Sequence, residues 1–331
     1  MQKVTVGVTV ALDKSLIEMI AAASPDIEVR ELGTLVREAA TSPEAKERLD
    51  AELAEVETMF FINPPVDIFT PAKKLRWAHC HSAGVEWMFG EGQKAPHFVV
   101  TNTQGVVDLP IAEHCFMFML NFVKNMSEFM EHKRKREYVR SMASMGFLGG
   151  KTLGVLGLGG IGGEVARLGK AFRMRVLANR RSGMRQSNVG DVDELYPPED
   201  LHDLLQECDF VVVALPLTSV THHYLSDPEF AVMKPTVFVI NVGRGEIIDE
   251  AALVQALEEG RIGGAGLDVF EVEPLAADSG LWGMPNVQIT THVAGSVTDK
   301  TPRAVKTFCD NLRLYLRGEP LRSVVDPTAG Y

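Results

Sequence analysis

Residues 153–162 read LGVLGLGGIG, a short apolar run that leads into closely spaced glycines. Gly157, Gly159 and Gly162 match the pattern G-x-G-x-x-G, and apolar residues at helical spacing follow from Val165 onward. In a strand–turn–helix unit the first glycine permits a tight turn, the second lets the backbone approach a pyrophosphate, and the third lets the helix pack on the strand. The stretch therefore predicts a dinucleotide-binding unit with the phosphates at the helix N-terminus.

Short apolar runs alternate with helix-like segments along the chain, which is typical of parallel sheets with crossover helices. The strand candidates lie at 4–8, 27–29, 59–62, 75–78, 99–100, 153–156, 176–178, 210–214, 237–241, 266–269 and 287–290. The pattern predicts an α/β protein with two Rossmann-like, doubly wound parallel-sheet domains. We expect a dinucleotide-binding domain at 102–293 and a discontinuous substrate domain at 1–101 and 294–331, because the last helix follows the final strand.

Composition narrows the class of protein. The 331 residues carry a net charge of −11, which disfavours a nucleic-acid or anionic-membrane binder. We expect the one basic run, at 132–136, to be a solvated helix face. The four cysteines, Cys80, Cys115, Cys208 and Cys309, form no C-x-x-C pair, and the N-terminus lacks a basic and apolar leader. We expect a cytoplasmic protein without disulfides, metal site or membrane partner.

Further motifs follow one another along nearly the whole chain. They are SAGVE at 82–86, TQGV at 103–106, AEH at 112–114, LPLT at 215–218, NVGRG at 241–245, LDVFEVEP at 267–274 and THVAG at 291–295. Together with the glycine turn, this ordered set resembles the D-isomer-specific 2-hydroxyacid dehydrogenases, and within them the glyoxylate/hydroxypyruvate reductase branch. The resemblance implies hydride transfer between a nicotinamide cofactor and a 2-keto acid.

The resemblance also implies three catalytic residues, Arg244, Glu273 and His292. Arg244 would bind the substrate carboxylate and keto oxygen, because a guanidinium binds a planar carboxylate in bidentate fashion. His292 would be the acid/base, since its unperturbed pKa lies near neutrality, and Glu273 would favour its charged form and fix its ring. Backbone N–H groups at Ala83 and Gly84 would take the other carboxylate oxygen of the substrate.

The expected contacts with the cofactor come from several turns. They are Gly157, Leu158, Gly159, Gly160, Ile161, Gly162, Asn179, Arg180, Arg181, Ser182, Leu215, Pro216, Thr221, Val242, Asp268 and His292. By resemblance, Asp268 would hold the nicotinamide carboxamide. Position 160 departs from the family, which usually has a polar or basic residue there, so a side-chain contact to the pyrophosphate is lost.

The second strand after the glycine turn indicates the cofactor. Residues 176–182 read VLANRRS, whereas an NAD-binding enzyme has an acid about 20 residues past the turn to accept from the ribose 2′-hydroxyl. We expect Arg180 to stack on the adenine, and Asn179, Arg181 and Ser182 to donate to a 2′-phosphate. NADP(H) is therefore the preferred cofactor. NAD(H) stays possible if these residues are solvated and no acid is needed.

The sequence thus predicts NADPH-dependent reduction of a small 2-keto acid, like glyoxylate or hydroxypyruvate, to the D-2-hydroxy acid. The small residues at 82–84 favour a compact substrate; Trp87, Met88 and Phe89 would suit a longer or aromatic one if they lined the pocket. The alternatives are NAD-dependent oxidation of a D-2-hydroxy acid and a corepressor-like, nucleotide-sensing binding module. The latter is disfavoured because the chain has no long disordered tails.

One long helix is expected at 110–136, and it carries more apolar residues than one domain face needs. It would either be buried between the two domains or form a dimer interface. The resemblance implies a two-fold dimer through this region, so we expect a homodimer.

Overall fold

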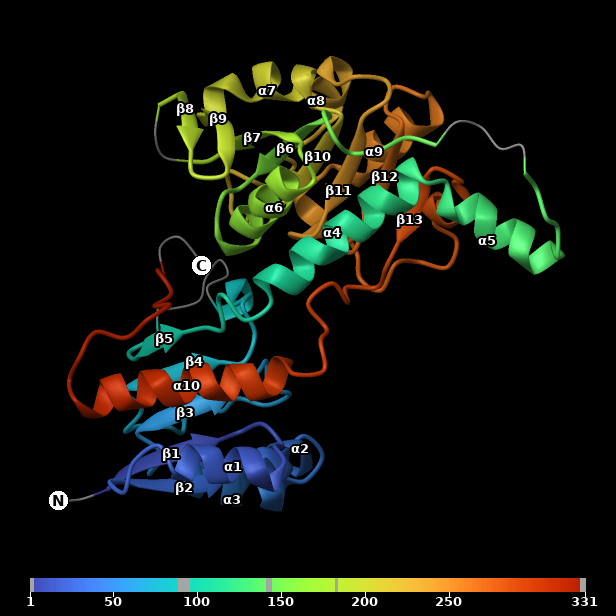
Figure 1. Ribbon diagram of the computed structural model, residues 1–331. Helices are drawn as coiled ribbons and strands as arrows, with labels where there is room; N and C mark the ends of the chain where they lie inside the picture. Colours follow the sequence, from blue (N-terminus) through green and yellow to red (C-terminus); the bar gives the residue numbers. More distant parts are fainter. Residues whose placement is uncertain (1–2, 89–95, 141–144, 182–183, 328–331) are drawn as a thin grey trace. The chain divides into compact units, whose positions relative to one another are not determined.

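The computed structural model describes residues 3–88, 96–140, 145–181 and 184–327 (Figure 1). The chain divides into two compact units. The first unit is Met1–Val106 with Thr298–Tyr331, and the second unit is Val107–Val297. These boundaries lie a few residues after those expected from the sequence, because the crossing after β5 stays with the first unit and residues 294–297 stay with the second. Ser182 and Phe89 lie outside the described residues.

The first unit is built on a five-stranded parallel sheet in the order β2-β1-β3-β4-β5. Its strands are β1 (Val4–Val8), β2 (Ile27–Glu31), β3 (Thr58–Phe61), β4 (Trp77–Cys80) and β5 (Val99–Thr101). Its helices are α1 (Lys14–Ala21), α2 (Gly33–Ala39), α3 (Pro43–Leu53), the 3-10 turn η1 (Glu86–Met88) and α10 (Lys300–Leu316). All five strands overlap runs that were expected from the sequence, whereas helix α2 was not predicted.

Helix α10 belongs to the first unit although it follows the last strand of the second. Its apolar face, with Val305, Phe308 and Leu312, is buried in one cluster with Ile20 of α1 and Trp77 of β4. Just beyond it, Val324 forms an antiparallel bridge with Thr101. Burial of this apolar stripe therefore brings the end of the chain back to the sheet with which it began.

The second unit has an eight-stranded sheet in the order β13-β12-β11-β10-β6-β7-β9-β8, with only β8 antiparallel (Figure 1). Its strands are β6 (Thr152–Leu156), β7 (Arg175–Asn179), β8 (Gln186–Val189), β9 (Val192–Tyr196), β10 (Phe210–Val213), β11 (Phe238–Asn241), β12 (Gly264–Leu267) and β13 (Val287–Ile289). Its helices are α4 (Asp108–Val123), α5 (Met126–Lys135), α6 (Gly160–Ala171), α7 (Leu201–Glu207), α8 (Asp227–Val232) and α9 (Glu250–Glu258), with 3-10 turns η2 (Pro198–Asp200), η3 (Gly245–Ile247) and η4 (Gly280–Gly283).

The fold confirms the predicted class of two α/β domains with parallel sheets, and the six runs expected in the second sheet are strands. The hairpin of β8 and β9 was not predicted. Strand β8 is almost entirely exposed at the edge of the sheet, so it has no apolar run by which to recognise it. A parallel sheet with this order has a switch point where the chain leaves β6, next to β10.

The prediction of a single helix at 110–136 is wrong, because α4 ends at Val123 and α5 begins at Met126. Asn125 between them has a left-handed φ of 51°, which asparagine tolerates better than most residues. The basic run at 132–136 does lie on an exposed helix end, as predicted. There His132 contacts Glu128 and Glu137, while Arg134 and Lys135 contact Glu131.

Two histidines of the first unit are buried in the neutral form. His79 on β4 is fully buried, its Nδ1 lies 2.7 Å from Thr101 Oγ1, and burial lowers its pKa to about 3. His81 follows the strand with its Nε2 3.1 Å from Thr301 Oγ1. Burial, assisted by the positive charge of Lys300, lowers the pKa of His81 to about 4. Neither is charged near neutrality, and each is charged more readily in the unfolded chain.

The first unit should therefore lose stability on acidification. Below about pH 6.5 the unfolded chain binds protons that the folded His79 and His81 do not, so the free energy of unfolding falls as the pH falls. The H81Q variant should show a smaller loss, by up to about 1.4 kcal/mol per pH unit between about pH 6 and pH 4. Urea unfolding followed through the fluorescence of buried Trp77 measures it.

The H97Q variant is the matched control, because His97 is an exposed histidine of the same unit. It should follow the unmodified protein at every pH. Parallel curves for H81Q and the unmodified protein would show that burial of His81 does not cause the acid sensitivity.

Candidate active site

The predicted motif residues of the second unit follow neighbouring strands at their carboxyl ends. Gly157 follows β6, Leu215 follows β10, Arg244 follows β11, Asp268 follows β12 and His292 follows β13. These strands are adjacent in the sheet and parallel, so their following loops meet at one edge. The sheet therefore brings together residues that lie up to 135 positions apart in the sequence.

Close backbone packing joins the first of these loops. Gly157 has a φ of 94°, and a Cβ there would lie 2.7 Å from the carbonyl oxygen of Ala214. A Cβ at Gly162 would lie 1.9 Å from the carbonyl oxygen of Gly157, so the helix packs on the turn only with glycine. Around Gly159, by contrast, no heavy atom of the described residues, apart from the glycine and its two chain neighbours, lies within 4 Å of where a Cβ would stand. The turn thus has tight contacts at its first and third glycines and open space at its second.

The structure gives a reason for the glycine at position 160. A Cβ there would lie 1.9 Å from Oδ2 of Asp108, the first residue of α4. The carboxylate of Asp108 therefore occupies the space in which a side chain at position 160 would begin. Position 160 therefore has glycine, instead of the family's usual polar or basic residue, because Asp108 at the start of α4 lies against it.

His292 and Glu273 form the expected pair. Nδ1 of His292 lies 2.8 Å from Oε2 of Glu273, while Oε1 of the same carboxylate accepts the backbone N–H of Phe270 at 3.2 Å. A carboxylate only accepts, so Nδ1 carries the proton and Nε2 is the ring nitrogen left for another partner. The His292 side chain is 51% exposed and its backbone φ is 57°. Its ring is therefore oriented yet accessible.

Asn241, for which the sequence indicated no role, holds the backbone of Arg244. The buried Asn241 side chain donates from Nδ2 to the Arg244 carbonyl at 2.9 Å and accepts the Gly243 N–H at 3.0 Å. Gly245 lies directly on the next loop, because a Cβ there would lie 1.8 Å from the backbone carbon of Phe270. The arginine loop is thus packed against the loop that carries Glu273. An asparagine ending an apolar strand is the signal that could have identified Asn241.

Asp268 holds the loop of His292, a role that the sequence did not indicate. Its carboxylate accepts the N–H groups of Val293 and Ala294, each at 2.9 Å, and the Thr290 hydroxyl at 2.6 Å. Its backbone carbonyl accepts the His292 N–H at 2.7 Å, and its side chain is 3% exposed. These internal bonds connect the carboxylate to the histidine loop, and its expected bond to a nicotinamide carboxamide stays a prediction.

Asn179 requires a correction at the end of β7. Its buried side chain donates to the carbonyls of Tyr196 and Pro197 and accepts the Tyr224 hydroxyl. Both amide hydrogens are therefore used inside the protein, and the expected donation to a 2′-phosphate is wrong. Arg181 is exposed directly after this strand, and Arg180 is partly exposed.

Two other predicted cofactor residues have structural tasks in the second unit. Thr221 closes the loop after β10, because its hydroxyl donates to Pro216 O at 2.7 Å and accepts the Thr218 N–H at 2.8 Å. Val242 turns its side chain into the core, so only its backbone is left to face a ligand. The cofactor contacts of Leu158, Ile161 and Leu215 stay predictions.

The predicted substrate loop lies in the first unit after β4. Asn102 Nδ2 donates to the Ala83 carbonyl at 2.6 Å, which fixes the loop next to Gly84. Met88 is buried in the core of this unit, and Trp87 packs on the same cluster, with its ring edge-on to Phe61. The alternative in which these two side chains line a substrate pocket is therefore not supported.

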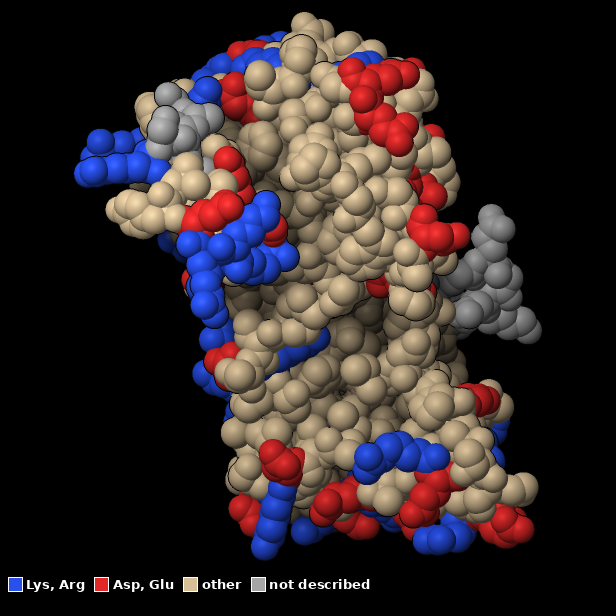
Figure 2. Space-filling view, turned by 90° about the vertical axis from the view of Figure 1, so that its right-hand side faces the viewer, with Lys and Arg blue, Asp and Glu red and all other residues tan. Residues whose placement is uncertain are grey.

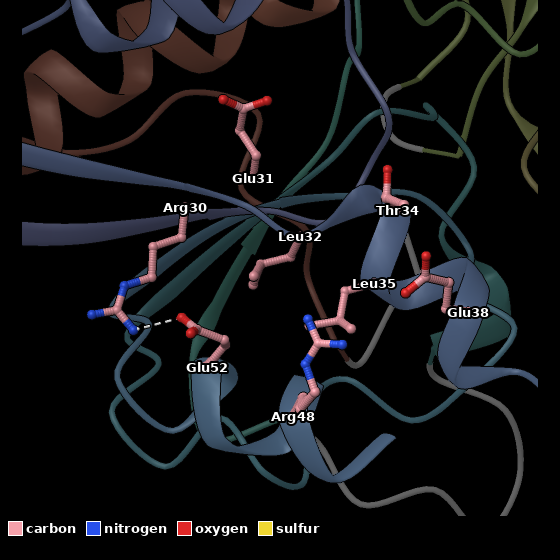
Figure 3. A pocket seen from close by; sticks show the side chains of 8 residues that line it. All are labelled: Arg30, Glu31, Leu32, Thr34, Leu35, Glu38, Arg48 and Glu52. Atoms are coloured by element: carbon pink, nitrogen blue, oxygen red, sulfur yellow. Dashed lines mark hydrogen bonds and ion pairs between the residues drawn. The ribbon is translucent and has the colours of Figure 1, made fainter. Parts of the chain in front are cut away.

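A separate hollow of about 490 Å³ lies in the first unit and contains none of the predicted site residues (Figure 3). It is lined by Arg30, Glu31, Leu32, Thr34, Leu35, Glu38, Arg48 and Glu52. Arg30 Nη1 contacts Glu52 at 2.9 Å across it. The charged side chains there are mostly exposed and mixed in sign, as on an ordinary protein surface.

Within the described ranges, no helix is long and apolar enough to cross a membrane. Among the same residues, no group of three or more His, Cys, Asp or Glu side chains is arranged to hold a metal ion.

A family model described as "D-isomer specific 2-hydroxyacid dehydrogenase, NAD binding domain" matches residues 116–294, more than half of the chain. The chain belongs to the D-isomer-specific 2-hydroxyacid dehydrogenase family. The resemblance of its ordered motifs is thereby confirmed. The match runs from α4 to the histidine loop and so covers Arg244, Glu273 and His292.

Curated relatives place this dehydrogenase in the glyoxylate reductase branch. It is 35% identical to glyoxylate/hydroxypyruvate reductase B of Shigella boydii, over 86% of this chain and 89% of the relative. It is 32% identical to a glyoxylate reductase of Pyrococcus furiosus, over 83% of each chain. Among solved structures, an NADPH-dependent glyoxylate/hydroxypyruvate reductase of Sinorhizobium meliloti, in complex with NADP and sulfate, is 28% identical with a TM-score of 0.82, covering 99% of this chain and 100% of that one.

Proposed function

We propose that this dehydrogenase reduces a small 2-keto acid to the D-2-hydroxy acid with NADPH. The observation that carries the proposal is the oriented pair of His292 and Glu273, with Nε2 of His292 left accessible, beside the packed loop of Arg244. Relatives that are named glyoxylate and hydroxypyruvate reductases support the reaction class.

His292, Glu273 and Arg244 have different roles in the proposed reaction. When bound, the nicotinamide cofactor supplies the hydride. Negative charge then develops on the carbonyl oxygen, and His292 delivers the proton that turns it into the hydroxyl. Glu273 accepts the Nδ1–H of His292, which orients the ring and leaves Nε2 for the substrate. Arg244 binds the carboxylate of the substrate, for which its planar guanidinium has the matching geometry.

The second unit fits a dinucleotide phosphate cofactor. The open space at Gly159, at the start of α6, is where a pyrophosphate would meet backbone N–H groups. After β7 the side chains are Arg180 and Arg181, while Asn179 is turned inside. An acid about 4 Å from a 2′-phosphate would repel it by on the order of 4 kcal/mol per charge pair, whereas a guanidinium attracts it by about 1.5–3 kcal/mol per bond. NADP(H) is therefore preferred, and NAD(H) is the weaker cofactor.

The substrate we favour is compact, with glyoxylate and hydroxypyruvate as the first candidates. The substrate loop offers only Ser82, Ala83 and Gly84, and the large side chains of Trp87 and Met88 belong to the core of the first unit. An apolar lining for an aromatic keto acid is thus missing from the part of this loop that the structure describes.

We also propose that the dehydrogenase is a homodimer. None of the described residues of α5 is buried, and apolar side chains there and just beyond are open to solvent, with Met130 47% and Phe147 66% exposed. Figure 2 looks onto the side on which α5 lies in Figure 1, and on the second unit it shows a broad area with few charged side chains. An uncharged area of this kind suits the self-complementary face of a two-fold dimer.

Replacement of His292 tests the reaction. The H292Q variant should lose about two to four decades of kcat with glyoxylate and NADPH, because it lacks the general acid. Cofactor affinity, measured by fluorescence titration of NADPH, should stay unchanged. The unmodified protein should have a higher kcat/KM for glyoxylate or hydroxypyruvate than for phenylpyruvate. Near-normal turnover by H292Q would exclude the proposed role.

Replacement of the two arginines tests the cofactor. The unmodified protein should prefer NADPH at least about tenfold in kcat/KM, and R180D/R181A should shift that preference toward NADH with little change in keto-acid KM. R173A is the control, since Arg173 is an exposed arginine at the amino end of β7 and should leave the preference unchanged. Equal use of both cofactors by the unmodified protein would exclude phosphate recognition by these arginines.

The mass in solution tests the assembly. Light scattering at micromolar concentration should give twice the chain mass of 36.3 kDa. M130E should weaken the dimer by placing a charge at an exposed apolar side chain of α5, whereas M19E, at an exposed position of α1 in the first unit, should not. A monomeric mass for the unmodified protein would contradict the proposal.

A further inference from the structure

A chain of side-chain hydrogen bonds runs from helix α4 to the loop of His292. His114 on α4 has its Nε2 2.9 Å from Oγ1 of Thr290, the residue after β13. The Thr290 hydroxyl lies 2.6 Å from Oδ1 of Asp268, the residue after β12. All three residues belong to the second unit, and His114 precedes the other two by more than 150 positions in the sequence.

The direction of each bond follows from the donors. A carboxylate only accepts, so the single hydroxyl proton of Thr290 goes to Asp268. The hydroxyl oxygen then accepts, and His114 donates to it from Nε2. Thr290 is the one member that both donates and accepts, and its two partners are 14% and 3% exposed. Loss of the hydroxyl would leave both groups with a bond missing in a place that water hardly reaches.

Asp268, the last member of this series of hydrogen bonds, holds the backbone of the His292 loop. Asp268 holds the N–H groups of Val293 and Ala294 with its carboxylate and the N–H of His292 with its carbonyl oxygen. His292 has a left-handed φ of 57°, a conformation that residues other than glycine seldom adopt unless their neighbours impose it. The direction of the Asp268 carboxylate therefore determines whether the loop keeps this conformation.

We propose that Thr290, supported by His114, is a positioning residue that fixes the Asp268 carboxylate and, through it, the place of His292. The proposal rests on the acid/base role of His292 proposed above. Neither Thr290 nor His114 needs to touch the substrate. The hydroxyl keeps the carboxylate turned toward the backbone of residues 292–294, so that the ring is held at the angle proton transfer needs.

Helix α4 has other anchors on the same strands, which separates positioning from folding. A Cβ at Gly266 would lie 2.8 Å from the ring of Phe118, so the helix is seated directly on β12. Gln288 Nε2 on β13 donates to the Phe118 carbonyl at 3.2 Å. The His114 ring also meets that of Phe118 edge-on, with centroids 4.8 Å apart. Removal of one hydroxyl at Thr290 therefore leaves the helix in place.

The test compares T290V, which keeps the shape of the side chain without its hydroxyl, with T290S, which keeps the hydroxyl. T290V should lower kcat roughly ten- to a hundredfold, the usual effect of misplacing a reacting group, while KM for keto acid and NADPH change by less than about threefold. T290S should retain most of the activity. T236V, at an exposed threonine before β11, should behave as the unmodified protein.

Amide hydrogen exchange supplies a readout that needs no activity. In T290V the amides of Val293 and Ala294 should exchange faster than in the unmodified protein, because their acceptor is no longer fixed, whereas T290S should protect them. If the unmodified protein reduces no keto acid but T290V still exchanges faster, the proposed function fails and the positioning stands. If T290V keeps both normal kcat and normal exchange, the positioning proposal is overturned.

His114 gives an independent pair of variants should T290V fail to fold. H114Q keeps an N–H donor near Thr290 and should retain most of kcat, whereas H114L removes the donor and should lower kcat with KM unchanged. Equal activities of the two variants, together with equal exchange at residues 293–294, would overturn the role of His114.

Discussion

The active-site edge depends on two buried polar side chains at the ends of neighbouring strands, Asn241 on β11 and Asp268 after β12. The Asp268 N–H donates to the Asn241 carbonyl at 3.1 Å, which joins them directly. Asn241 holds the backbone of the Arg244 loop, and Asp268 holds that of the His292 loop. Both side chains are almost completely buried. If either lost a hydrogen bond, no bond to water would compensate for the free energy of its desolvation. The loops are therefore held by buried groups whose bonds water is not placed to replace.

This arrangement explains how a loop site becomes rigid. Parallel strands bring their carboxyl ends to one edge, but the sheet alone does not set the conformation of the loops beyond it. Glycines allow the loops to approach one another, as Gly245 does on Phe270. The buried amide and carboxylate then determine the backbone course. The orientation of accessible side chains, such as His292, is therefore determined by this backbone and not by the packing of the side chains themselves.

The sequence predicted the features whose cause is local. The glycine turn was recognised because tight turns and close packing need glycine at those positions, and the family because its motifs occur in order. Asn179 was misassigned because its partners, Tyr196, Pro197 and Tyr224, come from distant parts of the chain. The break at Asn125 interrupts an apolar pattern that still looks helical on both sides. The task of Asp268 likewise became visible only with the backbone of residues 292–294 in place.

Exposure shows what the bond between His292 and Glu273 contributes. Their side chains are 51% and 37% exposed, and ion pairs in such surroundings add only about 0–1 kcal/mol to stability. The bond therefore serves to orient the ring and does not hold the loop together. The buried bonds of Asp268 carry that task instead. The fold of the loop and the orientation of the ring are thus assigned to different groups: the buried bonds of Asp268 hold the loop, and the exposed pair orients the His292 ring.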